Sequence, residues 1–403
     1  MSYNVSALRE QFPSLRSGIA HFDGPGGTQT PSPVIDAIGA ALAAPLSNRG
    51  RGIASELNAE SAVSAFRSAF ADFLGVPANG VVYGRSATQL NYDFSRALAK
   101  TWKPGDEIVV SRLDHDANVR PWVQAADAAG ATVRWIDIDP KSAELDLASA
   151  EEAITARTRL VAVTAASNLL GTKPPVHAVA DLAHSVGALV HVDGVHYAAH
   201  HLVDLDALGA DLFVCSPYKF LGPHCGVLAA KPELLEEIHP DKLLPSTNVV
   251  PERFELGTLP YEIMAGATAA VDFLAGLAPG DDTSRRERLR GAFDAIDDHE
   301  MGLRRQLEDA FERIGDQAIV HSRAADRTPT LLVTFPGRRC WDAYEHLATR
   351  DILAPAGSFY AYEPFRRLDL DDDHALRLGL APYSTTDDVA RVTAALADFL
   401  ASN

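Results

Sequence analysis

Between residues 80 and 230, short runs of apolar residues alternate with longer segments whose apolar positions recur at helical spacing. The apolar runs are rich in Val, Ile, Leu and Ala and predict strands at 105–111, 131–138, 158–166, 188–192 and 211–215. The other segments predict helices at 90–99, 118–129, 146–154 and 176–186. Near-continuous apolar strands separated by such helices indicate an α/β fold with a mostly parallel sheet covered on both faces. Ligands of such sheets bind at the carboxyl ends of the strands.

The pattern changes near residue 280. The breaker 278–280 (Ala-Pro-Gly) precedes a long, charged, amphipathic segment that predicts a helix over 281–314. Shorter units follow, with strands predicted at 330–335 and 375–381 and helices at 341–350 and 386–400. This alternation on a smaller scale predicts a second, α+β domain that starts near residue 280.

Composition supports a globular protein of two domains. The chain has 403 residues, of which 47% are hydrophobic and 22% charged, and these values exclude a disordered or collagen-like chain. Lys and Arg number 36 against 54 Asp and Glu, which gives a net charge of −18. So acidic a chain is a poor partner for nucleic acids and for anionic membranes.

Targeting signals and disulfides are not evident in the sequence. No apolar run reaches the roughly 18 residues of a membrane span, and residues 1–10 lack the basic and apolar regions of a secretory signal. Cys215, Cys225 and Cys340 are too few for a disulfide framework, and none lies in a CxxC motif. We therefore expect a soluble, cytoplasmic protein with no membrane partner.

Polar residues fall where predicted strands end or helices begin. Ser86, Ala87 and Thr88 precede the helix predicted at 90–99, and small or hydroxyl residues there leave backbone N–H groups free for a phosphate. Taken alone, such a serine is more often a simple helix cap. His115 follows the strand predicted at 105–111, which places it at the same edge of the sheet.

Asp193 and Lys219 form the most informative pair. Each lies just after an apolar strand, and their separation of 26 positions corresponds to one strand–crossover–strand unit. Both side chains are therefore expected at the same edge of the sheet. A lysine there can form a Schiff base, and a carboxylate can hold a protonated pyridine nitrogen. Alone, either residue would be interpreted as a cap or as a solvated loop residue.

Seven motifs follow one another along nearly the whole chain. They are 21–31 (HFDGPGGTQTP), 114–118 (DHDAN), 167–172 (SNLLGT), 191–194 (HVDG), 216–223 (SPYKFLGP), 254–258 (FELGT) and 377–383 (RLGLAPY). This ordered set resembles the class-V aminotransferase family of pyridoxal 5'-phosphate (PLP) enzymes, within its cysteine desulfurase-like branch.

The resemblance implies the architecture of the fold type I PLP-dependent transferases. A large PLP-binding domain is expected over 21–279, a smaller α+β C-terminal domain over 280–403, and an N-terminal segment, 1–20, packing with the small domain. It also implies PLP as the cofactor, a small amino acid as the substrate, and a homodimer with active sites at the interface.

The resemblance assigns a role to each matching residue. Lys219 would form an aldimine with PLP and later shuttle the substrate Cα proton, Asp193 would pair with the pyridinium nitrogen, and His115 would stack on the ring. Arg377 would hold the substrate α-carboxylate through two parallel N–H···O bonds. The other cofactor-binding residues that it implies are Ser86, Ala87, Thr88 and Ser216 at the phosphate, Asn168 and His196 near the phenolic oxygen, and Thr258 at the phosphate of the neighbouring subunit.

The chain departs from the family pattern at the loop 356–361 (AGSFYA), where true cysteine desulfurases carry a nucleophilic cysteine. A persulfide mechanism needs a mobile thiolate near the substrate sulfur, so a persulfide-forming desulfurase is disfavoured. We expect an aminotransferase. A C–S lyase or an epimerase acting on cysteine-like amino acids is the alternative. A catalytically inactive PLP-binding scaffold is the alternative of another class, although it would not need Lys219, Asp193, His115 and Arg377 together.

Two further departures concern the cofactor pocket. His196 stands where relatives often have Gln, and Tyr218 where they usually have His. Histidines also cluster at 184, 191, 196, 200 and 201, but no Glu follows His196 and no third ligand has a recognised spacing, so we predict no metal site. The substrate side-chain pocket is expected to draw on His196, Tyr218, Phe359, Tyr360 and Tyr362.

Overall fold

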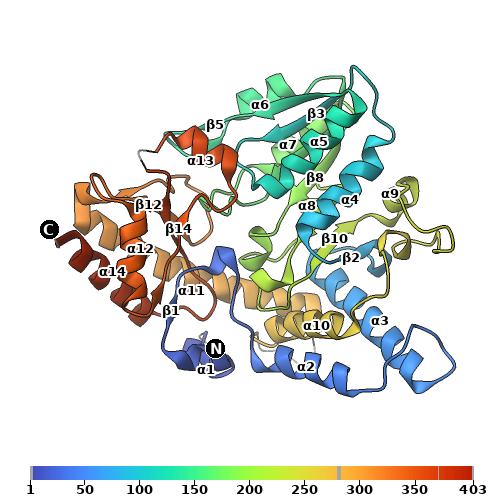
Figure 1. The fold of residues 1–403 in the computed structure, drawn as a ribbon, viewed down its shortest axis with the longest axis horizontal. Helices are drawn as coiled ribbons and strands as arrows, with labels where there is room; N and C mark the ends of the chain where they lie inside the picture. The colour runs from blue at the N-terminus through green and yellow to red at the C-terminus, as the bar shows by residue number, and fades with distance from the viewer. Residues whose placement is uncertain (1–2, 279–282, 371, 402–403) are drawn as a thin grey trace.

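The computed structural model describes residues 3–278, 283–370 and 372–401. A large region around a seven-stranded sheet lies beside a smaller region around a four-stranded sheet (Figure 1). The order of the large sheet is β2-β10-β9-β8-β7-β3-β4. Its strands are β2 (Val81–Gly84), β3 (Glu107–Ser111), β4 (Thr132–Ile136), β7 (Thr158–Thr164), β8 (Leu189–Asp193), β9 (Leu212–Cys215) and β10 (Gly226–Ala230).

Strand direction in the large sheet is mostly parallel. Pairs from β9 through β8, β7 and β3 to β4 are parallel, whereas β10 is antiparallel to both β9 and β2. The prediction of a mostly parallel sheet is confirmed. The sequence did not indicate β10. Its connection from β9, residues 216–225, is too short for the crossover helix that parallel strands need, so the chain returns antiparallel.

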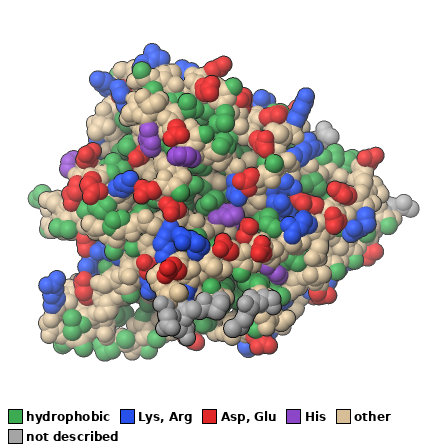
Figure 2. Space-filling model, turned by 180° about the vertical axis from the view of Figure 1, so that it is seen from behind, with side chains coloured by type: hydrophobic (Ala, Val, Ile, Leu, Met, Phe, Trp, Pro, Cys, Tyr) green, Lys and Arg blue, Asp and Glu red, His purple; other side chains and the backbone are tan. Residues whose placement is uncertain are grey.

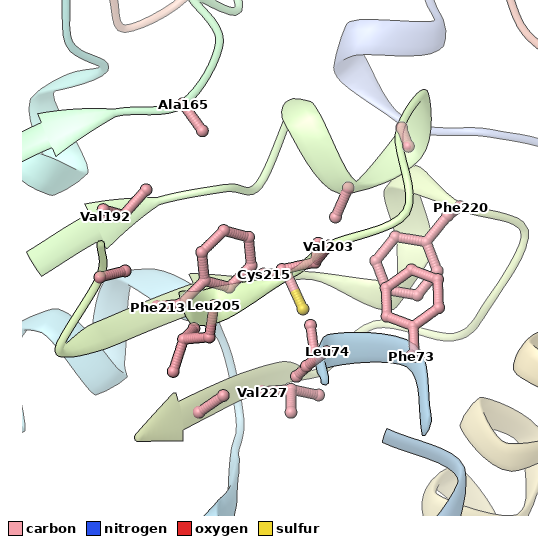
Figure 3. Close-up of a cluster of buried hydrophobic side chains, with 14 of the residues drawn as sticks. Phe73, Leu74, Ala165, Val192, Val203, Leu205, Phe213, Cys215, Phe220 and Val227 are labelled. Carbon is pink, nitrogen blue, oxygen red and sulfur yellow. The ribbon is translucent and has the colours of Figure 1, made fainter. Parts of the chain in front are cut away.

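Helices cover both faces of the large sheet. The helices on one face are α4 (Ala87–Ala99) and α5 (Arg120–Ala129), and those on the other include α3 (Ala54–Leu74), α7 (Val176–Ser185) and α10 (Tyr261–Ala275). Strand side chains alternate between the two layers, so that in β9 Phe213 and Cys215 join one buried cluster and Leu212 and Val214 the other. Figure 3 shows Cys215 inside its cluster, surrounded by apolar side chains.

The smaller region has a sheet of order β11-β12-β15-β14 with its own buried cluster. Its strands are β11 (Ile319–Val320), β12 (Thr330–Thr334), β14 (Ala356–Gly357) and β15 (Ala375–Gly379), and its helices are α12 (Cys340–Ala348), α13 (Tyr362–Leu368) and α14 (Thr386–Ala401). The strands and helices expected after residue 315 are therefore present within a few residues of their predicted bounds.

A long helix joins the two regions. It is α11 (Arg285–Ile314), and it begins with a capping box in which the Ser284 and Glu287 side chains bond each other's backbone N–H groups. The first two residues of the predicted helix, 281 and 282, lie outside the described residues. Leu289 on α11 belongs to a buried cluster of the large region and Leu307 to that of the small region, so one element packs against both.

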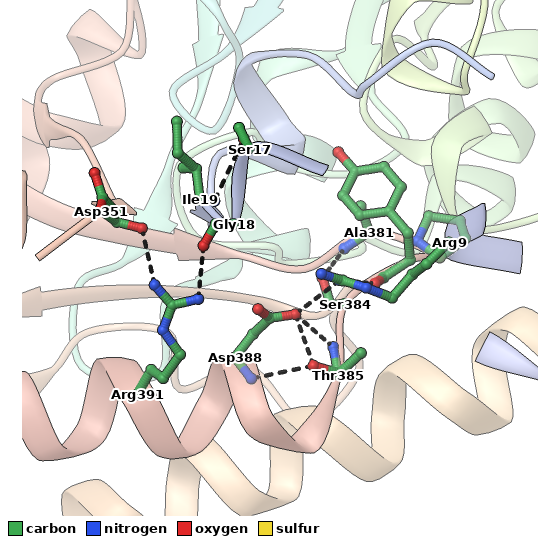
Figure 4. A network of polar contacts seen from close by, with 12 residues as sticks. Arg9, Ser17, Gly18, Ile19, Asp351, Ala381, Ser384, Thr385, Asp388 and Arg391 are labelled. Carbon is green, nitrogen blue, oxygen red and sulfur yellow. Dashed lines mark hydrogen bonds and ion pairs between the residues drawn. The ribbon is translucent and has the colours of Figure 1, made fainter. Parts of the chain in front are cut away.

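The N-terminal segment packs against the small region. It contains α1 (Val5–Glu10) and β1 (Ala20–His21), and β1 pairs in parallel with β13 (Ile352–Leu353). Figure 4 shows Arg9 reaching Asp388 on α14, at 3.0 Å. The domain boundaries at 20/21 and 279/280 stay predictions, and the second falls on residues 279–282, outside the described part of the chain.

Short elements complete the fold. They are α2 (Ser32–Ala43), β5 (Ile138–Asp139), β6 (Glu144–Leu145), α6 (Leu147–Ala153), α8 (Leu205–Leu208) and α9 (Pro232–Glu237). Figure 2 shows acidic and basic side chains interspersed over one face of the molecule, so the net negative charge is spread over that face. Among the helices that the structure describes, none combines the length and apolar character needed to cross a membrane.

Candidate active site

Two adjoining cavities lie where the parallel strands end and α4 begins. The inner cavity is lined by residues that follow β7, β8 and β9, and the outer cavity, of about 550 Å³, extends from it toward the small region. The two cavities share Thr88, His115, Ala117, Asn168, Tyr218 and Lys219. The edge of the sheet that the sequence singled out is therefore hollow.

Lys219 lies between the two cavities. It ends a short 3-10 helix, η6 (Pro217–Lys219), that directly follows β9, and its Nζ contacts the Pro25 carbonyl and lies 4.9 Å from the centre of the Tyr218 ring. Burial, reinforced by the charge of Arg377, lowers the pKa of Lys219 to about 7. A large fraction of this amine is therefore unprotonated and nucleophilic near neutral pH.

Asp193 ends β8 and lines the inner cavity. Its Oδ1 accepts a hydrogen bond from the Val195 N–H at 2.9 Å. Burial raises the pKa of Asp193 to about 6, although the bond from Val195 and the charge of Lys219 both oppose this shift. Such a carboxyl group favours a cationic partner inside the cavity, because a nearby positive charge would restore its ionised form.

His115 follows β3 and lines both cavities. Its Nδ1 accepts a hydrogen bond from the Ala117 N–H at 3.0 Å, and its ring stacks on Tyr360 with centres 5.7 Å apart. Burial and the charges of Lys219 and Arg377 lower the pKa of His115 to about 4. The ring is therefore neutral at physiological pH, as a stacking surface for an aromatic ligand should be.

A buried network holds the His115 loop in place. The Asp114 carboxyl accepts hydrogen bonds from the Ser111 hydroxyl and, at 2.7 Å, from the Asn118 amide. Asn118 in turn accepts a bond from the Trp122 indole N–H at 3.1 Å. Of these residues, only Asp114 and Asn118 lie in the motif at 114–118, and the sequence assigns none of them a role, because only the fold brings them together behind His115.

The N-terminus of α4 opens into the inner cavity. Ser86 is the helix cap, because its hydroxyl accepts a bond from the Gln89 N–H at 3.0 Å, and Ala87 and Thr88 form the first turn. Ser86, Ala87, Thr88 and Ser216 all line the inner cavity. Ser86 can therefore cap α4 and also lie at a site for an anion, so the two interpretations of this serine do not exclude each other.

Thr258 lies apart from the other predicted residues. It lines a small surface groove with Arg85 and Gln89 and does not line either cavity. Within one chain the structure does not bring Thr258 to the predicted site, and its expected role at a neighbouring subunit stays a prediction.

Arg377 projects from β15 into the outer cavity and is buried. Its Nη1 donates to the Asn168 carbonyl at 3.1 Å, its Nη2 donates to Asp23 at 2.5 Å, and its guanidinium lies 3.8 Å from the centre of the Phe359 ring. The Nε atom has no hydrogen-bond partner among the described residues. The structure therefore places a fixed, buried cation at the cavity wall formed by the small region.

His196 and Asn168 carry further unpartnered atoms in the site. His196 Nε2 lies 2.8 Å from the Thr328 hydroxyl and 3.2 Å from the Thr330 hydroxyl, whereas no described residue pairs with its Nδ1. The Asn168 amide N–H donates to the Phe359 carbonyl at 2.9 Å, and in the described part of the chain its oxygen has no partner. Burial lowers the pKa of His196, so this ring is neutral. Unsatisfied polar atoms of this kind favour a polar ligand.

The expected side-chain pocket is only partly assembled in the outer cavity. Tyr218, Phe359 and Tyr360 line it, but Tyr362 lines an adjacent surface groove and His196 lines the inner cavity alone.

The backbone is strained at two residues of the outer cavity. Phe359 and Tyr360 both have a φ of 56°, a left-handed conformation that is unfavourable for aromatic residues and is concentrated at functional sites.

Sequence reasoning did not assign a role to several residues of the outer cavity. They include Asp23, Tyr92, Asp116 and Arg120. Asp23 was visible only as one letter of the motif at 21–31. Asp116 follows His115 in the motif at 114–118 and Arg120 lies four residues further on, so both reach the cavity with the His115 loop, whereas long-range folding brings Asp23 and Tyr92 there.

Cysteines and metal ligands are not gathered at the site. Cys215 and Cys225 are buried in the core of the large region and Cys340 in that of the small region, and none of the three lines either cavity. Burial raises the pKa of Cys225, so its thiol stays protonated. Among the described residues, no three His, Cys, Asp or Glu side chains are arranged to hold a metal ion.

Comparison with known proteins gives consistent matches over the full length. The family model described as Aminotransferase class-V matches residues 20–392. The chain is 28% identical to "Aminotransferase-like protein FGM3" of Gibberella zeae, over 98% of each chain, and 31% identical to a "Probable cysteine desulfurase" of Pseudomonas aeruginosa, over 97% of each. The crystal structure of the cysteine desulfurase CsdA from Escherichia coli superposes with a TM-score of 0.87 at 27% identity, covering 99% of this chain and 98% of that one.

Proposed function

Because the chain belongs to the class-V aminotransferase family of PLP-dependent enzymes, we propose that it transfers the amino group of a small α-amino acid. Family membership supports an enzyme rather than an inactive scaffold. The reaction type, the substrate and the roles of the individual residues are the proposed part.

The residues around the inner cavity fit PLP. A buried lysine with a lowered pKa suits the cofactor aldehyde, and a buried carboxyl group without a fixed cation suits a protonated pyridine nitrogen. The N-terminus of α4 suits the phosphate, the unpartnered Nδ1 of His196 suits the phenolic oxygen, and the unpartnered Asn168 oxygen would accept a hydrogen bond from the phenolic O–H. When bound, PLP supplies an electron sink for negative charge that develops at the substrate Cα.

The protein's own residues would transfer the proton, hold the cofactor and orient the substrate. Lys219, whose amine is partly neutral near pH 7, would accept the proton from the substrate Cα and deliver it to an adjacent atom of the cofactor. Asp193 would keep the ring nitrogen protonated, and the neutral His115 ring would cover one face of the cofactor. Arg377 would orient the substrate by its α-carboxylate, and Phe359 and Tyr360 would shield the reacting atoms from water.

The absence of a cysteine at either cavity is the observation that favours transamination over sulfur transfer. A persulfide mechanism needs a mobile thiolate, whereas all three cysteines are buried in hydrophobic clusters. Tyr360 lies at the cavity in the loop where the resemblance places the nucleophilic cysteine. The relatives named as cysteine desulfurases support a second candidate, a C–S lyase that eliminates sulfide from cysteine without a persulfide.

A homodimer is the proposed assembly. The segment 239–258 carries Thr258 and exposes the apolar side chains of Leu243, Leu244, Val249 and Leu256. Exposed apolar residues in such a group are typical of a protein interface. A second copy covering this segment would also provide a neighbouring subunit for Thr258.

Absorbance of the purified holoenzyme tests the lysine. Lys219→Ala should lose the visible absorbance of lysine-bound PLP, because no other lysine lines the cavities. Lys231→Ala is the matched control, since Lys231 is an exposed residue paired with Asp206, and it should keep the absorbance. An unchanged visible spectrum in the Lys219→Ala protein would show that the lysine is wrongly assigned.

Product analysis separates the two candidate reactions. A single turnover with alanine or another small amino acid, without added oxo acid, should convert PLP to pyridoxamine phosphate and release the matching oxo acid. Release of pyruvate and sulfide from cysteine, with PLP regenerated, would instead identify the lyase. Formation of alanine and a protein-bound persulfide from cysteine would contradict both.

A further inference from the structure

The guanidinium of Arg377, the proposed anchor of the substrate α-carboxylate, already holds a carboxylate of the protein itself. Asp23 accepts a hydrogen bond from Nη2 at 2.5 Å, and both side chains line the outer cavity. The Arg377 side chain is 3% exposed, whereas that of Asp23 is 27% exposed. The pair therefore joins a buried, fixed cation to an anion that water can reach.

The backbone holds Asp23 beside the arginine. Asp23 forms a parallel β-bridge with Gly379, which lies two residues after Arg377 on β15. Its carbonyl accepts hydrogen bonds from the Gly26 N–H at 2.9 Å and from the Gly27 N–H at 3.1 Å. A side chain at Gly26 would collide with the Asp23 carboxylate, so the glycine leaves space for that group. The anion is thus built into the site.

We propose that Asp23 is a specificity-determining residue, which occupies the carboxylate position at Arg377 until the α-carboxylate of an amino acid displaces it. This role rests on the proposed function, because it takes Arg377 as the substrate anchor. The exchange forms one charge-assisted contact and breaks another, and the Asp23 carboxylate moves into water at the mouth of the cavity.

Because of this exchange, a carboxylate binds Arg377 favourably only when the same ligand also makes a second interaction in the site. An anion that only replaces Asp23 gains little, because one charge-assisted contact is traded for another. An amino acid also brings an α-amino group for the chemistry at Lys219, and this second interaction shifts the balance in its favour. Asp23 therefore discriminates amino acids from simple carboxylates, which would otherwise occupy the cationic anchor.

Arg377 keeps its position without Asp23. The Asn168 carbonyl still accepts from Nη1, and the Phe359 ring still covers the guanidinium. Neutralising Asp23 should therefore free the anchor without moving it.

The test compares ligand binding to the wild-type and Asp23→Asn holoenzymes. Propionate, which has a carboxylate and no amine, should bind the variant about tenfold more tightly, the difference between a charge-assisted and a neutral hydrogen bond. Propionamide, which lacks the charge, should bind both proteins equally. Asp72→Asn is the matched control, because Asp72 pairs with Arg285 at 2.9 Å away from both cavities, and it should leave propionate binding unchanged. Unchanged or weaker propionate binding to Asp23→Asn would overturn the proposal.

A crystal structure of the wild-type holoenzyme with propionate provides a test that needs no variant. The Asp23 carboxylate should leave Arg377 when propionate binds there, and an Asp23–Arg377 pair that persists beside the bound ligand would refute the exchange. Failure of the proposed function is recognised separately. A wild-type protein without PLP absorbance contradicts the function, whereas a normal spectrum with unaltered propionate binding in Asp23→Asn contradicts only the role of Asp23.

Discussion

Asp114, behind the His115 loop, is a carboxyl group whose protonation is set by burial. It is fully buried, and burial, with the nearby charge of Asp193, raises its pKa from 3.8 to about 8 despite hydrogen bonds from Ser111 and Asn118. The folded protein therefore holds a proton on Asp114 at neutral pH that the unfolded chain releases. A neutral Asp114 avoids a second buried negative charge near Asp193.

This difference in pKa gives stability a dependence on pH. Between pH 3.8 and about 8 the folded state binds more protons at Asp114 than the unfolded state, so the free energy of unfolding falls as pH rises. The slope from this one group approaches about 1.4 kcal/mol per pH unit. Asp114→Asn should remove that contribution, and urea unfolding across this pH range measures it. An identical slope in the variant would show that Asp114 is ionised in the folded protein.

At the scale of elements, α14 is both a helix of the small region and the anchor of the N-terminal segment. Asp388 lies in its first turn, where it accepts hydrogen bonds from the Thr385 N–H at 3.0 Å and from the Thr385 hydroxyl at 2.8 Å. The same carboxylate oxygen binds Arg9, and Arg391 on α14 donates to the Gly18 carbonyl at 2.9 Å (Figure 4). One helix terminus thereby connects residues that lie at opposite ends of the chain.

Asp388→Ala should lower the free energy of unfolding by about 2 kcal/mol, because the capping bonds with Thr385 and a partly buried ion pair with Arg9 are lost together. Asp387→Ala is the matched control, since Asp387 lies in the same turn but is exposed. Chemical denaturation measures both variants, and limited proteolysis should cut within residues 3–20 faster in Asp388→Ala alone. Equal stability of the two variants would mean that Asp388 acts only as a surface charge.

At the scale of the whole molecule, the segment 239–258 exposes apolar side chains that a second copy of the chain would cover in the proposed homodimer. Leu244 is 97% exposed and Leu243 70% exposed, and with Val249 and Leu256 they form a group of exposed apolar side chains within one segment, which is typical of an interface. If a second copy covers them, a single chain leaves these apolar side chains in water, and each cofactor site is expected to depend on both subunits.

Leu244→Asp should therefore convert a dimer to a monomer, because a buried charge without a partner is strongly unfavourable at an interface. Light scattering after size-exclusion chromatography measures the mass. Leu147→Asp, at an exposed leucine on α6, is the control and should keep the wild-type mass. A Leu244→Asp protein that remains dimeric would place the interface on another surface.

The sequence by itself determined β3, β4, β7, β8 and β9, the helices α4, α5, α6 and α7, most elements of the small region, and the edge of the sheet at which chemistry is expected. These features depend on local periodicity and on topology. The sequence did not indicate β2 and β10, or the helices α2, α3 and α10. Strands β7, β8 and β9 lie within a few residues of their predicted bounds, and Asp193 and Lys219 both line the inner cavity. The resemblance of the motifs added the family and the cofactor, which the comparisons confirmed.

Only the tertiary structure decided which distant residues meet and how burial changes them. Asp23 and Arg377 are 354 positions apart, and the buried contact of His200 Nδ1 with the Glu300 carboxyl group, at 2.7 Å, spans 100. No local pattern specifies such contacts, because they depend on how two separate cores pack along α11. The lowered pKa of Lys219 also depends on the tertiary structure, because burial away from water, rather than residue type, makes this lysine a nucleophile.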